Sequence, residues 1–132
     1  MRSFNLKVVT PDGLIFDSAV ESLLVRTDDG DVEFLAGHID YMASIGTGRA
    51  RIKIDNQDRF ASVSGGFVTV KRGEVKLVAI TFEFREQIDL ERAEAAKEAA
   101  KSALSAATDD KDIKLAKAKL ARAMNRIGVA KG

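Results

Sequence analysis

Residues 75–107 read VKLVAITFEFREQIDLERAEAAKEAAKSALSAA, and the hydrophobic pattern changes its period within this stretch. Before Ile88, apolar and polar residues follow the two-residue period of half-buried strands. After Ile88, the chain is rich in Ala, Glu and Lys, which favour helices. This change predicts an α+β chain with two domains, a β-sandwich in residues 1–87 and an α-helical hairpin in residues 88–132.

The part before this boundary consists of short alternating runs separated by turn signals such as Thr10-Pro11-Asp12-Gly13. Strands are predicted at residues 6–8, 14–16, 20–27, 32–35, 41–45, 49–54, 59–64, 67–70 and 75–84. Gly65-Gly66 is predicted to break the chain between two of these strands. Eight to ten short strands at this spacing predict a β-sandwich or a flattened barrel.

The part after the boundary predicts two helices. Asp89 is a candidate N-cap for a first helix over residues 89–107, because its carboxylate can accept the unpaired amides of the first turn. Thr108-Asp109-Asp110 interrupts the pattern and caps a second helix over residues 110–127, and Gly128 is predicted to end it. A short polar turn between two helices indicates an antiparallel hairpin.

Both predicted helices carry a narrow apolar stripe. The first stripe is Leu90, Ala93, Ala96, Ala100, Leu104 and Ala107, and the second is Ile113, Ala116, Leu120, Ala123, Met124 and Ile127. Alanines let two helices approach closely but bury little area each. We therefore expect the hairpin to be marginally stable by itself and to depend on what it docks against.

The bulk composition excludes several classes of protein. Lys and Arg total 21 and Asp and Glu total 20, so no global charge favours nucleic acid or a membrane surface. There is no cysteine, which excludes disulfides and suits a reducing compartment. No signal-peptide pattern and no apolar run of about 20 residues is present. The sequence predicts a soluble cytoplasmic protein that reaches a membrane only through a partner.

The residues needed for catalysis are nearly absent, so we predict a protein that is not an enzyme. His38 is the only histidine and there is no cysteine, which excludes the common His/Cys metal sites. We predict no catalytic residue. A turn histidine bonded to the backbone is favoured over a general base. Ser64 has no partnered base, and Gly46-Thr47-Gly48 is more typical of a turn than of a phosphate loop.

Binding is better supported than catalysis. Arg122 and Arg126 lie four residues apart and project from one helical face. If the hairpin folds back, Arg92 and the acids Glu83 and Asp89 can converge with them near its open end. Arginine forks suit phosphate oxygens, and a carboxylate can accept from an amine or a ribose hydroxyl. These side chains also fit solvated helix charges with an N-cap, and the spacing alone favours that second interpretation.

Several segments together resemble the epsilon-subunit family of bacterial F-type ATP synthases. They are the first strand and turn at residues 6–13, the segment GDVEFLAGH at residues 30–38, Gly48, and the segment SGGFVTV at residues 64–70, followed by a strand and the two-helix tail. The order and spacing of these segments cover nearly the whole chain. The sequence departs from the family pattern at Ile39-Asp40-Tyr41, where relatives carry a small residue and a proline.

The resemblance implies a fold and a set of partners. The family has a β-sandwich that binds the gamma subunit and the membrane c-ring, and it helps to transmit torque for ATP synthesis coupled to hydrogen-ion or other ion transport. Its hairpin is a switch that permits ATP hydrolysis when folded and inhibits hydrolysis when extended into the alpha and beta subunits. The protein would be a peripheral subunit at the cytoplasmic face of the cell membrane, without a catalytic cofactor.

The resemblance also implies a regulatory ATP site. Residues 88–93, IDLERA, match a motif of ATP-binding relatives. The implied ligand contacts are Glu83, Ile88, Asp89, Arg92, Ala93, Arg122 and Arg126. The tightest-binding relatives carry a further arginine where this chain has Ala99, and the loss of one charged contact is expected to weaken binding about ten-fold or more.

Two other classes of function compete with this interpretation. The first is a β-sandwich adaptor whose basic helix binds nucleic acid or an acidic protein surface, since residues 113–132 hold six basic residues and no acidic one. That helix has no aromatic residue for base stacking, which disfavours single-strand binding. The second, a small hydrolase, needs a base-activated nucleophile that the sequence does not contain.

Overall fold

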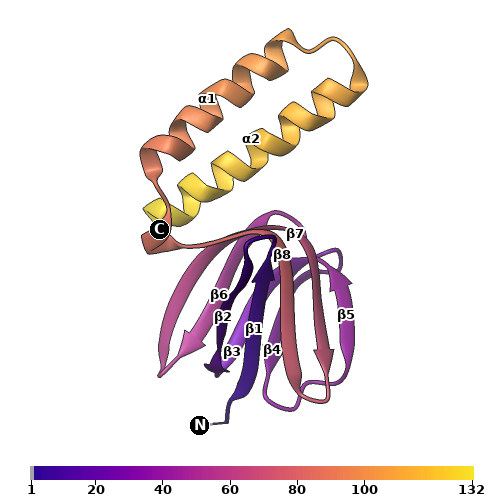
Figure 1. The fold of residues 1–132 in the computed structure, drawn as a ribbon, viewed down its shortest axis with the longest axis vertical. Coiled ribbons are helices and arrows are strands. Elements are labelled where there is room, and N and C mark those ends of the chain that lie inside the picture. Colours follow the sequence, from indigo (N-terminus) through magenta and orange to yellow (C-terminus); the bar gives the residue numbers. More distant parts are fainter. Residues whose placement is uncertain (1) are drawn as a thin grey trace. The chain divides into compact units, whose positions relative to one another are not determined.

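A computed structural model describes residues 2–132 of the chain, and these divide into two compact units, Met1–Phe84 and Arg85–Gly132 (Figure 1). The first unit contains strands and the second contains helices, which confirms the predicted α+β class. A short 3-10 turn, η1 at Arg85–Gln87, opens the second unit.

The described part of the first unit contains eight strands. Their bounds are β1 Phe4–Thr10, β2 Gly13–Val20, β3 Ser22–Thr27, β4 Gly30–Leu35, β5 Tyr41–Ser44, β6 Gly48–Ile54, β7 Gln57–Lys71 and β8 Glu74–Phe84. The strand order is β2-β1-β8-β7-β6-β3-β4, and β5 pairs with β7. The β1–β8 pair is parallel, and the other pairs are antiparallel. The continuous sheet curves so that its strands face one another in a sandwich (Figure 1).

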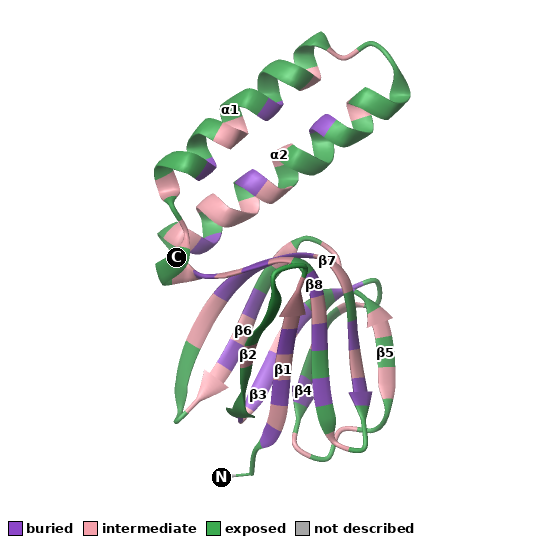
Figure 2. Cartoon of the chain, viewed as in Figure 1, coloured by how far each residue is buried: buried purple, intermediate pink, exposed green. Residues whose placement is uncertain are grey.

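The alternation of apolar and polar residues along the strands places the apolar side chains in one core, inside the sandwich that the curved sheet forms. On β1, Leu6 and Val8 are fully buried, whereas Asn5 and Lys7 between them are only half-buried. Buried segments alternate along most strands in the same way (Figure 2). The largest fully buried side chains are Phe34, Leu6, Leu23, Ile52 and Leu77. The core cluster lies entirely within residues 4–84, so the sandwich has a core of its own.

The predicted chain break at Gly65-Gly66 is wrong, because β7 continues through both glycines. The first part of β7 pairs with β6 up to Val63, and its last part pairs with β5 from Phe67 onward. The two glycines have φ angles of 70° and 98° and lie where the strand changes its neighbour. The two glycines allow one long strand to bend, and glycine often occurs inside a strand for this reason.

The run predicted as one strand at residues 20–27 is also corrected. The chain bends at Glu21, so that Val20 ends β2 and Ser22 begins β3. The main-chain amide of Glu21 donates to the carbonyl oxygen of Lys53 at 2.8 Å. A one-residue bend without glycine or proline leaves no mark in the hydrophobic pattern. The sequence therefore offers no reason to divide residues 20–27 into two strands.

The second unit is an antiparallel pair of helices, α1 at Leu90–Ala106 and α2 at Asp110–Lys131 (Figure 1). Asp89 caps α1, as predicted, and its carboxylate accepts the Arg92 amide at 3.1 Å. Asp109 caps α2 in the same way through the amide of Asp112 at 2.8 Å. Neither of these two helices is long and apolar enough to cross a membrane.

The predicted end of the second helix at Gly128 is wrong. Helix α2 continues to Lys131, and the left-handed φ of 83° that favours glycine occurs instead at Gly132. The extra turn buries the side chain of Val129, which is 1% exposed. Tertiary packing of that side chain outweighs the weak helix propensity of Gly128.

The seam between the helices is dominated by alanine, as the sequence predicted. The buried hairpin residues are Ala93, Ala100, Ala116, Ala123 and Val129. Leu104, Ile113, Leu120 and Ile127 of the predicted stripes are half-buried, and Met124 is 53% exposed. The few buried segments on the helices contrast with those on the strands (Figure 2). The hairpin therefore gains little from apolar burial compared with the sandwich.

Candidate functional site

The start of α1 carries the matched motif residues at positions 88–93. Ile88 is half-buried before the helix, and its amide donates to the carbonyl oxygen of Arg85 at 3.3 Å. Asp89 is exposed and uses its carboxylate on the Arg92 amide. Ala93 is 2% exposed, and its amide donates to the carbonyl oxygen of Asp89. Residues 88–93 thus form a capped helix start with an exposed acid and an exposed arginine.

The three candidate arginines lie on one side of the helical seam. Arg92 immediately precedes the buried Ala93 on α1, and Arg122 immediately precedes the buried Ala123 on α2. One residue turns a helix by about 100°, so each arginine flanks its own seam residue on the N-terminal side. In an antiparallel pair, these two flanks fall on the same face. Arg126 follows Arg122 by four residues and shares that face.

The position of an ion pair is consistent with this assignment of faces. Glu94 immediately follows Ala93, which places it on the opposite flank of the seam. The Lys131 Nζ atom lies 3.7 Å from the Glu94 Oε1 atom. The last turn of α2 therefore lies beside the first turns of α1, and the Glu94–Lys131 pair occupies the flank away from the arginines.

Two of the three arginines on this face have no ion-pair partner among the described residues. Arg92 is exposed, and Arg122 and Arg126 are half-buried. Within residues 2–132, the side chains of Arg92 and Arg122 form no ion pair. Guanidinium groups arranged on one face attract polyanions and offer paired donors to phosphate oxygens.

Glu83 is placed in the other unit. It lies on β8, is half-buried, and pairs across the sheet with Ser62 of β7. The other six candidate residues, Ile88, Asp89, Arg92, Ala93, Arg122 and Arg126, belong to the helical unit. The structure thus brings six of the seven onto one hairpin.

Arg85 is a functional candidate that the sequence analysis missed. Its Nε atom donates to the main-chain oxygen of Val129 at 2.7 Å, and the two residues are 44 positions apart. The acceptor is a backbone carbonyl, which has no signature in a sequence. The one signal in the sequence is that Arg85 is a cation next to the predicted domain boundary. A cation near the C-terminal end of a helix is favourable, but the sequence does not show that Arg85 lies near the end of α2.

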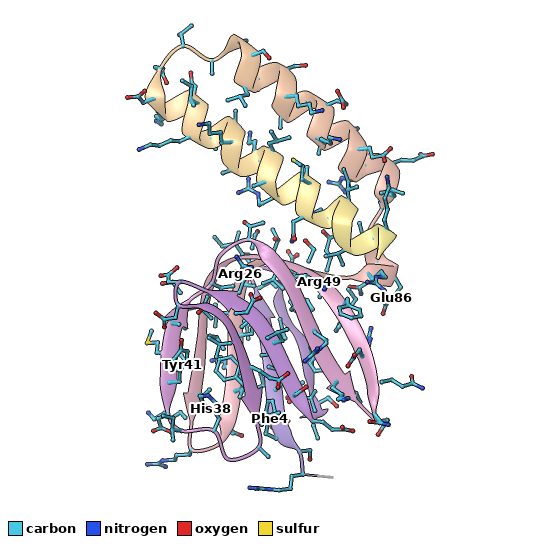
Figure 3. The ribbon with its side chains drawn as sticks, turned by 180° about the vertical axis from the view of Figure 1, so that it is seen from behind. Phe4, Arg26, His38, Tyr41, Arg49 and Glu86 are labelled. Carbon is cyan, nitrogen blue, oxygen red and sulfur yellow. The ribbon has the colours of Figure 1, made fainter. Side chains whose placement is uncertain are left out.

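His38 and Ser64 both have structural roles in the sandwich. The Nδ1 atom of His38 lies 2.8 Å from the carbonyl oxygen of Ile39, which confirms a turn histidine bonded to the backbone. Its ring packs edge-on against Phe34 and Tyr41, and Figure 3 shows it beside Tyr41 on the sandwich. The buried Ser64 bonds the hydroxyl of Thr81 at 2.6 Å. Residues 2–132 contain no cluster of three or more metal-ligating side chains.

A second polar contact of the sandwich involves the only tyrosine. The Tyr41 hydroxyl donates to an Oδ2 atom of Asp29 at 2.8 Å, between β5 and the turn before β4. This hydrogen bond is the main cause that raises the pKa of Tyr41 above its usual value of 10.0, and burial raises it further. The contact ties a sandwich turn to the strand that follows the His38 loop.

The fold and the arginine face define a two-unit protein, a β-sandwich followed by a capped helical hairpin with an anion-attracting face. The family profile described as the beta-sandwich domain of the ATP synthase delta/epsilon chain matches residues 3–85. The profile described as the long alpha-helix domain of the same chain matches residues 86–131. The chain belongs to the ATP synthase delta/epsilon chain family.

Individual relatives agree over the full length. The chain is 42% identical to the ATP synthase epsilon chain of Bacillus velezensis, covering 98% of both chains. It is 42% identical to that of Bacillus subtilis with the same coverage, and 37% identical to that of Staphylococcus haemolyticus, again over 98% of each.

Solved structures with a similar fold are more distant in sequence. A chain of the Euglena gracilis mitochondrial ATP synthase (OSCP/F1/c-ring) superposes with a TM-score of 0.79 at 23% identity, covering 93% of this chain and 78% of that one. A chain of the Tetrahymena thermophila mitochondrial ATP synthase central stalk and c-ring gives 0.69 at 11% identity, covering 98% and 97%. These likenesses establish the fold.

Proposed function

We propose that this chain is the epsilon subunit of an F-type ATP synthase, a non-catalytic subunit of the central stalk. The full-length match to bacterial epsilon chains supports this assignment. In this role the sandwich binds the gamma subunit and the c-ring, and it helps to couple ion-driven rotation to ATP synthesis. The subunit lies peripherally at the cytoplasmic face of the cell membrane, held there by the complex.

The second part of the proposal is that the hairpin inhibits ATP hydrolysis when it extends toward the alpha and beta subunits. The hairpin is a compact unit separate from the sandwich core, and its seam buries four alanines and one valine. An element with so little apolar burial opens at a low free-energy cost. Such an element suits a switch between two arrangements.

The third part is that ATP binds the folded hairpin. The observation that carries it is the common face of Arg92, Arg122 and Arg126, which belong to two different helices. A triphosphate that contacts all three bridges α1 to α2 and neutralises their mutual repulsion. The proposed ligand contacts on the hairpin are the six residues Ile88, Asp89, Arg92, Ala93, Arg122 and Arg126, and the expected contact of Glu83 stays a prediction from the sequence.

Binding to one state alone is sufficient to control such a switch. A ligand that binds only the folded hairpin stabilises it by about 2.7 kcal/mol at a hundred-fold excess over Kd. ADP, which lacks the third phosphate, binds more weakly. Ala99 lies seven residues after Arg92 and therefore on the same helical face, where it offers no charge to the phosphates.

The experiment is a titration of the full-length chain with ATP, followed by calorimetry and by the amide resonances of α1 and α2. Arg126→Ala is expected to weaken ATP binding about ten-fold or more, since charged hydrogen bonds contribute about 1.5–3 kcal/mol. Lys117→Ala is the matched control, because it removes a cation from the same helix one residue after the seam residue Ala116, on the opposite flank. Equal affinities of the two variants, or unchanged hairpin resonances at millimolar ATP, would refute the site.

A further inference from the structure

The last turn of α2 is held by a side chain from the first residues of the helical unit. The Arg85 Nε atom, on η1, donates to the main-chain oxygen of Val129 at 2.7 Å. The amide of Gly132 donates to the same oxygen at 3.3 Å. Both lone pairs of this carbonyl are thereby used, one by the helix cap and one by a residue that precedes α1.

This contact combines two favourable terms. The last four carbonyl groups of a helix lack the amide partner that the next turn would supply, and at Val129 the cap amide of Gly132 and the shorter bond from Arg85 take its place. The C-terminal end of a helix also carries a partial negative charge, which attracts a guanidinium group. Arg85 supplies both the donor and the charge to α2.

The contact is located where the hairpin has its largest buried side chain. Val129 is 1% exposed, and it is the only residue of the helical unit among the largest fully buried side chains of the described chain. On the other flank, Lys131 pairs with Glu94 of α1. The final turn of α2 is thus fixed to η1 and to α1 together.

We propose that Arg85 is a positioning residue of the folded hairpin, which we call its latch. Its hydrogen bond holds the last turn of α2 in place and thereby positions the arginine face. Arg126 lies three residues before Val129, so the latch holds the helical turn that presents this arginine. Any opening that separates the end of α2 from η1 breaks the Arg85–Val129 hydrogen bond. The link to nucleotide control rests on the function proposed above, whereas the latch itself rests on the contact.

The latch is tested in the full-length chain without nucleotide by amide hydrogen exchange. Arg85→Gln is expected to raise the exchange rates of the last-turn amides of α2 about ten-fold, which corresponds to about 1.4 kcal/mol. Arg85→Lys keeps the charge without the planar fork and is expected to give a smaller increase. Lys101→Gln is the matched control, because it removes an exposed cation in the middle of α1 whose ion-pair contact, to Glu98, spans 3.9 Å.

Exchange rates in Arg85→Gln that equal those of Lys101→Gln would overturn the latch. Complete loss of protection in α1 and α2 with intact strand amides would support it, because the hairpin would then depend on this contact. An equal loss of amide protection in the strands would mean that Arg85→Gln unfolds the whole chain, which contradicts a latch confined to the hairpin. In that case the exchange rates of the folded variant Arg85→Lys are compared with those of Lys101→Gln.

A second readout separates the latch from the nucleotide proposal. Arg85→Gln is expected to weaken ATP binding several-fold while Lys101→Gln leaves it unchanged. If ATP does not bind the wild-type chain, the proposed nucleotide function fails, and the exchange rates still decide the latch. If ATP binds both variants equally and only exchange differs, Arg85 stabilises the last turn without positioning the ligand face, and the positioning role is refuted.

Discussion

Gly66 lies at the bend of β7 and pairs with Ala79 of the neighbouring strand β8. Its φ is 98°, and a Cβ atom at this position would lie 1.8 Å from the carbonyl oxygen of Val78. Only glycine tolerates both the backbone conformation and the close approach of β8. Any larger residue at this position would displace β8 from β7, so the bend in β7 requires glycine.

Tyr41 gives a prediction at the same scale, because it is the only tyrosine and the chain has no tryptophan. Its hydrogen bond to Asp29 raises its pKa above 10.0. The stabilisation of the folded chain by this hydrogen bond is therefore fully present below the unfolded-state pKa of Tyr41. It is lost as the pH rises through the higher folded-state pKa. We expect tyrosinate absorbance of the native chain to titrate with a midpoint above 10.0.

The matched variants for this titration are Asp29→Asn and Asp12→Asn. The first removes the charge that the Tyr41 hydroxyl contacts and is expected to lower the midpoint toward its usual value. The second removes a carboxylate from an exposed turn and is expected to change nothing. A midpoint that does not respond to Asp29→Asn would contradict the contact.

The candidate site illustrates which residues a sequence can provide. The Asp89 cap and the arginine pair at positions 122 and 126 follow from local spacing, which fixes the helical face. Arg85 does not follow, because its partner is a backbone carbonyl 44 residues away. Contacts between a side chain and a distant main-chain atom leave no pattern of residue types.

At the scale of elements, the period of the apolar residues predicted the strands and both helices. It failed where an element ends or bends for a tertiary reason. Helix α2 runs past Gly128 because Val129 is buried in the following turn. The strand that contains Gly65 and Gly66 continues because it pairs with β6 first and β5 later.

Helix α2 therefore carries an avoidable destabilisation at Gly128. A Cβ atom there would meet nothing within 4 Å apart from the adjacent backbone of its own helix, and the backbone is not in the left-handed region. Gly128→Ala is expected to stabilise the hairpin by about 0.5–1 kcal/mol, because alanine loses less backbone entropy in a helix. Helical circular dichroism during thermal unfolding measures this change.

The reverse substitution is the control. Ala118 is exposed in the middle of α2, and Ala118→Gly is expected to destabilise the hairpin by a similar amount. A lower unfolding temperature for Gly128→Ala would show that the last turn of α2 is not helical in solution. In that case the Arg85 contact with Val129 would also lose its basis.

At the scale of the whole molecule, the chain combines a unit with a large apolar core and a unit with an alanine seam. The core cluster of the sandwich contains no residue of the hairpin. The apolar core of the sandwich therefore does not depend on the hairpin, as the proposed switch requires. This division of stability is the physical basis of the proposed role, a fixed coupling unit with a movable brake.

The measurement that tests this claim most directly compares the full chain with residues 1–87 on an F1-ATPase prepared from the same cells without its epsilon subunit. Both chains are expected to bind the enzyme, because the sandwich is intact in each. Only the full chain should slow ATP hydrolysis at low ATP, and rising ATP should relieve that inhibition. Equal inhibition by the two chains, or no inhibition by the full chain at any ATP concentration, would contradict a brake in the hairpin.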